Sequence, residues 1–161
     1  MRIALCAVGL LALVNAHAQD SKIGFVSTER IFREAAPAKA AQAKIEQEFS
    51  KREKELQDMA GRLKALSEKF DKEAAVLSES DRAKRQRDLT DLDKEFQRKQ
   101  REFREDLNQR RNEELATVLD RTNRVIKQIA EAEKYDIVFQ EAVFASQRID
   151  ITDKVLKALN K

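Results

Sequence analysis

The stretch that decides the fold runs from Phe49 to Leu77 and reads FSKREKELQDMAGRLKALSEKFDKEAAVL. Within it a bulky apolar residue recurs every seven positions, at Phe49, Leu56, Leu63, Phe70 and Leu77. A second, less complete apolar line is marked by Ile45, Met59 and Leu66. Most of the remaining positions are charged. A seven-residue apolar repeat in a charged background is typical of a helix that packs along one narrow seam, as in a coiled coil.

The apolar line breaks at residues 78–82, which read SESDR and suit a turn followed by a new helix N-cap. Beyond this break the seam resumes at Leu89, Leu92, Phe96, Phe103 and Leu107. The two arms match as mirror images, because the position numbers of facing residues such as Phe70 and Leu89 add to 158 or 159. We therefore predict an antiparallel helical hairpin over residues 39–111, with its turn near 78–82. At ~1.5 Å per residue each arm would be roughly 50–60 Å long.

The segments on either side of the hairpin carry short strand and helix signals. Residues 22–27 read as a strand, and a brief helix follows from Thr28 with Ser27 or Thr28 as its cap. Pro37 suits the first turn of the next helix. Residues 112–161 begin with a wide apolar helical face, followed by two expected strands at 135–139 and 142–145. A last helix is expected after Thr152, its predicted N-cap, and carries apolar residues at Val155, Leu156 and Leu159.

These elements predict a mainly α protein with a small β body (α+β), from which the hairpin projects. Residues 19–38 and 112–161 would form the body, which at about 70 residues is marginal for an isolated core. It would also leave strand edges open in a monomer. We therefore expect the body to associate with further copies, and the candidate body and oligomer residues are Ile23, Phe25, Val26, Val138, Phe139, Val143 and Phe144.

The N-terminus has the pattern of a secretory signal peptide. Met1-Arg2 precedes an apolar run over 3–14, and Ala16 and Ala18 occupy the two positions that signal peptidase reads. The run is shorter than the ~20 residues that a membrane-spanning helix needs. Cleavage after Ala18, and hence export to the periplasm, is predicted. It would remove Cys6 and His17, the only cysteine and the only histidine of the chain.

Composition excludes several functional classes. Without Cys and His, nucleophiles of those types and Cys/His zinc sites are excluded, and no Gly-rich phosphate loop is present. We therefore expect neither an enzyme nor a cofactor or metal. Charged residues make up 38% of the chain and aromatic residues 6%, which favours long exposed helices. Because acids and bases are mixed throughout and the net charge is only +3, no nucleic-acid partner is expected.

The layout as a whole resembles the Skp/OmpH family of periplasmic chaperones. The residues that carry the resemblance are KIGFV at 22–26, the segment from Phe103 to Glu114, YDIV at 135–138 and DITDKVL at 150–156. The resemblance implies a homotrimer whose bodies assemble at one end, with three hairpins projecting around a cavity. It also implies that unfolded outer-membrane β-barrel proteins are held there without ATP. Some members bind lipopolysaccharide through basic residues, and the resemblance places that site at Lys99, Arg110 and Arg111.

The thin seam suggests where an unfolded client could touch the hairpin. The candidate client contacts are Met59, Leu66, Phe70, Leu77 and Leu89, although the same residues could serve only to join the two arms. Residues 62–87 hold eight Lys/Arg against five acids, which makes an anionic membrane surface a further candidate partner. The alternative function is a structural coiled-coil envelope protein or adhesin without chaperone activity. A continuous helix would favour that alternative, whereas a chain that folds back favours the chaperone.

Overall fold

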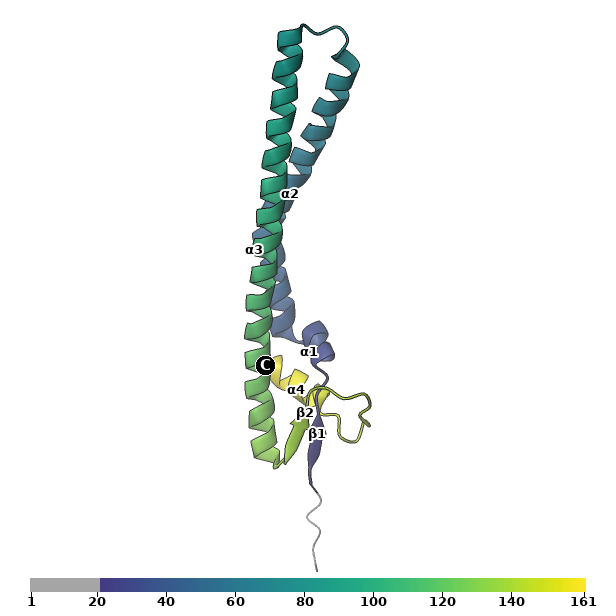
Figure 1. Ribbon diagram of the computed structural model, residues 1–161. Coiled ribbons are helices and arrows are strands. Elements are labelled where there is room, and N and C mark those ends of the chain that lie inside the picture. The colour runs from purple at the N-terminus through teal and green to yellow at the C-terminus, as the bar shows by residue number, and fades with distance from the viewer. Residues whose placement is uncertain (1–20) are drawn as a thin grey trace, which may run out of the picture.

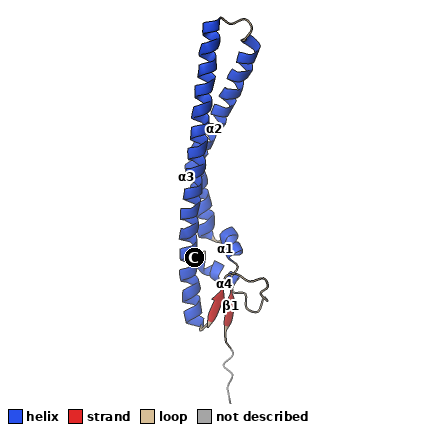
Figure 2. Cartoon of the chain, in the orientation of Figure 1, coloured by secondary structure: helices blue, strands red, loops and turns tan. Residues whose placement is uncertain are grey.

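The computed structural model describes residues 21–161 and shows a long helical hairpin standing on a small body (Figure 1). The predicted signal peptide and its cleavage site after Ala18 lie outside the described residues. The elements in chain order are β1 (Ile23–Phe25), α1 (Thr28–Glu34), α2 (Ala36–Glu73), α3 (Glu79–Glu133), β2 (Ile137–Phe139) and α4 (Thr152–Leu159). Helices dominate and the strands are confined to the body (Figure 2), which confirms the predicted fold class.

The two hairpin helices differ in length because only one of them continues into the body. Helix α2 has 38 residues and begins at Ala36 with Pro37 in its first turn, as predicted. Helix α3 has 55 residues and runs without interruption from the tip of the hairpin to the far end of the body (Figure 1). It contains no Gly or Pro, so nothing in its sequence breaks the helix at 111–112, where the hairpin was expected to give way to the body.

The turn lies at residues 74–78, earlier than the predicted 78–82. Ser78 has extended backbone angles and is the N-cap of α3, because its Oγ accepts a hydrogen bond from the backbone N–H of Asp81 at 3.1 Å. Glu79 and Asp81 lie in the first helical turn, where carboxylates are favoured by the positive end of the helix dipole. The polar stretch SESDR is therefore the start of a helix, and the turn precedes it.

Ion pairs between the arms fix the register of the hairpin. Lys44 Nζ lies 2.9 Å from Glu114, Arg110 Nε lies 3.1 Å from Glu48, and Arg52 Nη1 lies 2.8 Å from Asp106. Near the tip Arg85 pairs with Glu73. The position numbers of each of these four pairs add to 158, which confirms the mirror-image register predicted from the apolar residues.

Strand β1 is paired along both of its edges in the body. It pairs in parallel with β2, with Gly24 opposite Val138, and on its other side Phe25 forms a parallel bridge with Asp150. The N-terminal strand is therefore paired on both sides with segments from the C-terminal part of the chain. The predicted strand at 142–145 is wrong, since residues 142–145 lie in a loop between β2 and α4. Both edges of β1 are already occupied, so this segment finds no partner on β1 within one chain.

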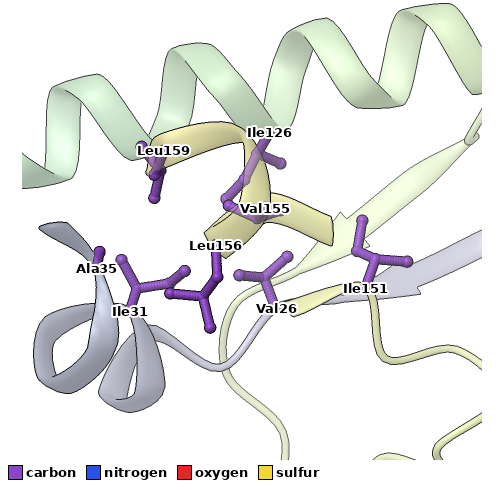
Figure 3. Packing of buried hydrophobic residues seen from close by; sticks show 8 residues of the cluster. All are labelled: Val26, Ile31, Ala35, Ile126, Ile151, Val155, Leu156 and Leu159. Carbon is purple, nitrogen blue, oxygen red and sulfur yellow. The ribbon is translucent and has the colours of Figure 1, made fainter. Parts of the chain in front are cut away.

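The core of the body joins both ends of the chain to α3. Figure 3 shows the cluster, which draws on the N-terminal segment, on α3 and on α4: Val26, Ile31, Ala35, Ile126, Ile151, Val155, Leu156 and Leu159. Thr152 is fully buried and is the first residue of α4, so the prediction that it is the N-cap is wrong. Its hydroxyl instead accepts a hydrogen bond from the backbone N–H of Ser27 at 2.9 Å, and Asp150 Oδ1 accepts from the N–H of Thr152.

Candidate functional site

The apolar seam of the hairpin is only partly covered. Phe49 is the one buried residue of α2, and Leu66 keeps 42% of its surface exposed. The other candidate client contacts, Met59, Phe70, Leu77 and Leu89, are half-buried. Three of the five candidates come together, since Leu66, Phe70 and Leu89 line one cavity of about 280 Å³ between the arms near the tip. Met59 and Leu77 do not line this tip cavity.

Charged side chains lie around the tip cavity. Arg85 lines it together with Lys69 and Asp88, and pairs with Glu73 on the opposite arm. The hydrogen bond from Arg85 holds the pKa of the Glu73 carboxyl below its usual range. The tip cavity therefore combines an apolar lining with a charge pair that ties the two arms together.

The lower hairpin is joined by an aromatic cluster. The rings of Phe49 and Phe103 meet edge to face, with centroids 5.7 Å apart and an interplanar angle of 77°. The Arg52 guanidinium lies 5.5 Å from the centre of the first ring and 5.8 Å from the second, and also pairs with Asp106. We call these four residues the aromatic clasp. Edge-to-face rings and a stacked cation are both attractive arrangements, so we expect the aromatic clasp to be the strongest contact of the hairpin seam.

A larger groove lies below the aromatic clasp, where the hairpin meets α1. Its volume is about 690 Å³, and its apolar lining comes from α1, α2 and α3: Phe32, Ile45, Phe49, Leu107, Leu115 and Val118. We call it the base groove. The base groove was not predicted as a site from the sequence, although the wide apolar face that begins at Leu115 was its signal. Part of that face packs inside the protein and part is accessible at the groove, since Val118 is buried while Leu115 stays 44% exposed.

The three candidate lipopolysaccharide residues are in different environments. Lys99 is half-buried and lines a small cavity with Leu56 and Phe103. Arg110 is held by carboxylates, pairing with Glu48 across the hairpin and with Glu114 on its own helix. The hydrogen bond to Glu48 raises the pKa of Arg110.

Arg111 is exposed and lies on the wall of the base groove. The three basic residues therefore do not form one cluster of available cations, because Arg110 is committed to the hairpin register.

The candidate oligomer residues divide into core and surface. Val26 is fully buried in the body and serves its core. Phe25 and Val138 are half-buried, and Ile23 and Phe139 are 38% and 45% exposed. Val143 and Phe144 are almost completely exposed on the loop that follows β2. The body thus presents several large apolar side chains to solvent around its sheet.

The described chain offers little to hold a metal or to cross a membrane. Within residues 21–161, no three His, Cys, Asp or Glu side chains are grouped so as to bind a metal ion. None of the helices in that range is long and apolar enough to span a bilayer.

These features define the class as a helical-hairpin protein with a small α+β body and partly exposed apolar surfaces. The chain belongs to the outer membrane protein (OmpH-like) family, whose sequence profile matches residues 22–159. It is 30% identical to the Chaperone protein Skp of Pectobacterium atrosepticum over 158 residues, which cover 95% of this chain and 96% of that protein. It is also 30% identical to the Chaperone protein Skp of Escherichia coli (strain K12), covering 92% of this chain and 91% of that one.

A solved structure shares the fold. It is that of a candidate outer membrane chaperone (OmpH-like) from Caulobacter crescentus, with a TM-score of 0.73 and 20% sequence identity. The match covers 87% of this chain and 84% of that one, so the similarity includes both the hairpin and the body.

Proposed function

We propose that this protein is an ATP-independent holdase chaperone of the periplasm, which binds unfolded outer-membrane β-barrel proteins and prevents their aggregation. The observation that carries the proposal is a projecting hairpin whose apolar seam stays partly exposed along its length. The relatives named Chaperone protein Skp support it, since they match 95% and 92% of this chain. The fold-back at 74–78 speaks against a continuous rod, and therefore against the alternative of a structural spacer or adhesin.

The physical basis is many weak contacts over a long surface. An unfolded β-barrel protein exposes alternating apolar side chains and unpaired strand edges, and both promote aggregation. The half-buried seam residues and the apolar grooves of the hairpin can each contact a few of these side chains. Because no single contact is strong, the client exchanges freely and can leave without ATP hydrolysis. We propose no catalytic step and no cofactor.

We further propose that three copies assemble through their bodies, so that the hairpins surround a cavity for the client. The exposed apolar residues around the sheet support this, especially Val143 and Phe144. In this arrangement the segment 142–145, which has strand-like sequence but forms no strand in one chain, would pair with another copy. Light scattering of the purified protein should give about three times the subunit mass. A monomer at micromolar concentration would contradict the trimer.

Export is part of the proposal. Cleavage after Ala18 should give a periplasmic protein that begins at Gln19, and mass spectrometry of the periplasmic fraction measures this directly. A protein that keeps residues 1–18 would contradict the proposed processing.

Binding to lipopolysaccharide, or to an anionic membrane surface, is proposed for Lys99 and Arg111. Arg110 is a poor test residue, because replacing it also removes its ion pairs with Glu48 and Glu114. The double substitution Lys99→Gln and Arg111→Gln should weaken binding to lipopolysaccharide, and Arg104→Gln on the same helix is the control. Unchanged binding by the double variant would remove the site.

The decisive experiment for the chaperone function is a dilution assay. A urea-unfolded outer-membrane β-barrel protein is diluted into buffer with or without the purified protein, and light scattering follows aggregation. We expect scattering to be suppressed at a small molar excess of the chaperone. If the client precipitates as fast as in buffer alone, the holdase function is wrong.

A further inference from the structure

The base groove differs from the rest of the seam in size and in composition. Its volume of about 690 Å³ lies within the range of about 300–1,000 Å³ that is usual for ligand pockets, whereas the tip cavity is smaller, at about 280 Å³. Its floor includes Phe49 and Val118, which are 6% and 4% exposed. Leu115, at 44%, remains accessible. The groove is therefore a large, open recess with a mainly apolar lining and an accessible apolar side chain at its edge.

The polar residues of the groove are suited to a peptide backbone. Gln42 and Asn112 line it from the two arms, and neither side chain forms a hydrogen bond with another residue in the described range 21–161. An amide side chain has both donors and an acceptor, as a backbone peptide group does. Two such amides on opposite walls could bind the N–H and C=O groups of an extended chain laid between them.

The charges that line the groove disfavour an anionic lipid inside it, which is a separate question from contact of the exposed Arg111 with an anionic surface. Glu46 and Glu53 line the wall formed by α2, and Arg111 lines the wall formed by α3. None of these three forms an ion pair within residues 21–161. Glu114, the remaining charged residue of the lining, is already neutralised by Lys44 and Arg110. Two available carboxylates against one guanidinium would repel an acyl chain with an anionic headgroup, whereas a neutral or basic polypeptide segment is compatible with them.

We propose that the base groove is a binding site for one extended apolar segment of an unfolded polypeptide. A bulky side chain would pack on the floor formed by Phe49 and Val118, and the backbone on either side would hydrogen-bond to Gln42 and Asn112. This inference rests on the proposed holdase function and assigns one contact within it. It places the contact with the larger recess at the foot of the hairpin, next to the body, and not at the tip.

A matched pair of substitutions tests the proposal. Ala41 lines the groove, whereas its neighbour Ala40 is exposed and does not line it. Ala41→Phe should fill the groove with an apolar ring, while Ala40→Phe adds the same ring outside it. The probe is a fluorescein-labelled ten-residue peptide of alternating Leu and Thr, followed by fluorescence anisotropy. We expect Ala41→Phe to weaken peptide binding at least tenfold, and Ala40→Phe to leave it within twofold of the parent protein.

A second variant protects the test against misfolding. Leu115→Lys puts a charge at the edge of the groove, where the side chain is 44% exposed and can reach water, and should also weaken binding at least tenfold. Circular dichroism and light scattering check whether each variant keeps its helicity and its assembly.

Three outcomes would overturn the proposal. The first is that Ala41→Phe and Leu115→Lys bind the peptide as the parent does. The second is that the parent protein does not bind the peptide at all. The third is that Ala41→Phe alters the oligomeric mass, which would mean that a second copy occupies the groove. The dilution assay with an unfolded β-barrel protein judges the holdase function separately, since suppression of aggregation by the parent keeps that function even when the groove proposal fails.

Discussion

Replacing Phe49 by alanine should cost more stability than any other single truncation in the hairpin seam. Phe49 is 6% exposed, forms the edge-to-face contact with Phe103 and lies under the Arg52 guanidinium. Truncating a buried Phe to Ala costs about 3–5 kcal/mol in protein cores. Since Phe49 also lines the base groove, water can reach part of the space that its ring leaves. We therefore expect a loss at the lower end of that range, about 3 kcal/mol.

The matched control is Leu66→Ala on the same helix. Leu66 is 42% exposed, and fully burying a leucine contributes about 1.5–3 kcal/mol, so its truncation should cost about 1 kcal/mol. Urea unfolding followed by circular dichroism at 222 nm gives both free energies, measured at one protein concentration because assembly shifts apparent stability. If the two variants lose the same free energy of unfolding to within about 0.5 kcal/mol, the seam contributes equally at both positions. That result would refute the aromatic clasp as the strongest contact of the seam.

The remaining predictions concern two glycines, the buried Thr152 and the ion pairs of Glu34. Gly24→Ala should lower the free energy of unfolding by about 1–3 kcal/mol, because the Cβ of the new alanine would lie 3.2 Å from the Tyr135 ring. Gly61→Ala in α2, where an added Cβ meets nothing within 4 Å, should raise the free energy of unfolding by about 0.5–1 kcal/mol. Thermal melts in which the melting temperatures of both glycine variants shift in the same direction would contradict this. Thr152→Val should cost about 1–3 kcal/mol by leaving the Ser27 N–H unpaired, and Thr152→Ser should restore most of it in the same urea assay. Hydrogen bonds from Arg30 and then Arg33 lower the pKa of Glu34 from 4.5 to about 2, so its contribution to stability is present above about pH 4.5 and is lost as the pH falls towards 2. Unfolding midpoints of Glu34→Gln between pH 5 and 2 should fall less steeply than those of the parent, and equal slopes would refute the assignment.

The hairpin could be predicted because the apolar pattern that specifies it is periodic and local in the sequence. Apolar residues at seven-residue spacing give a helix with one seam, and their mirror-image positions give the register that the ion pair between Glu48 and Arg110 shows independently. The turn was predicted too late because the serines of SESDR are ambiguous. Ser78 suits a turn and an N-cap equally, and only its hydrogen bond to the N–H of Asp81 decides that it begins the helix.

The body was harder to predict because its contacts are distant in sequence. A strand-like pattern at 142–145 could not show that both edges of β1 are taken by β2 and by the bridge to Asp150. Threonine is a favoured N-cap residue, but the hydroxyl of Thr152 accepts a tertiary hydrogen bond from the N–H of Ser27 instead. Among the site residues, the family resemblance pointed to Arg110 as a lipopolysaccharide contact, yet Glu48 and Glu114 hold it. Such pairings depend on which residues face each other across elements, and a single helical period does not contain that information.

The parallel pairing of β1 with β2 has a consequence for the order of folding. Lys22 donates its backbone N–H to Asp136, 114 positions further along the chain, and α4 must also be in place before the core closes. Strand β1 is among the first of these segments to be synthesised, yet its partners are among the last. The hairpin, in contrast, forms from contacts that spread outward from its own turn, and local contacts form faster than distant ones. A newly made chain should therefore complete its long helices first and wait with an unpaired apolar strand at its beginning, so that for a short time the protein is itself an aggregation-prone chain.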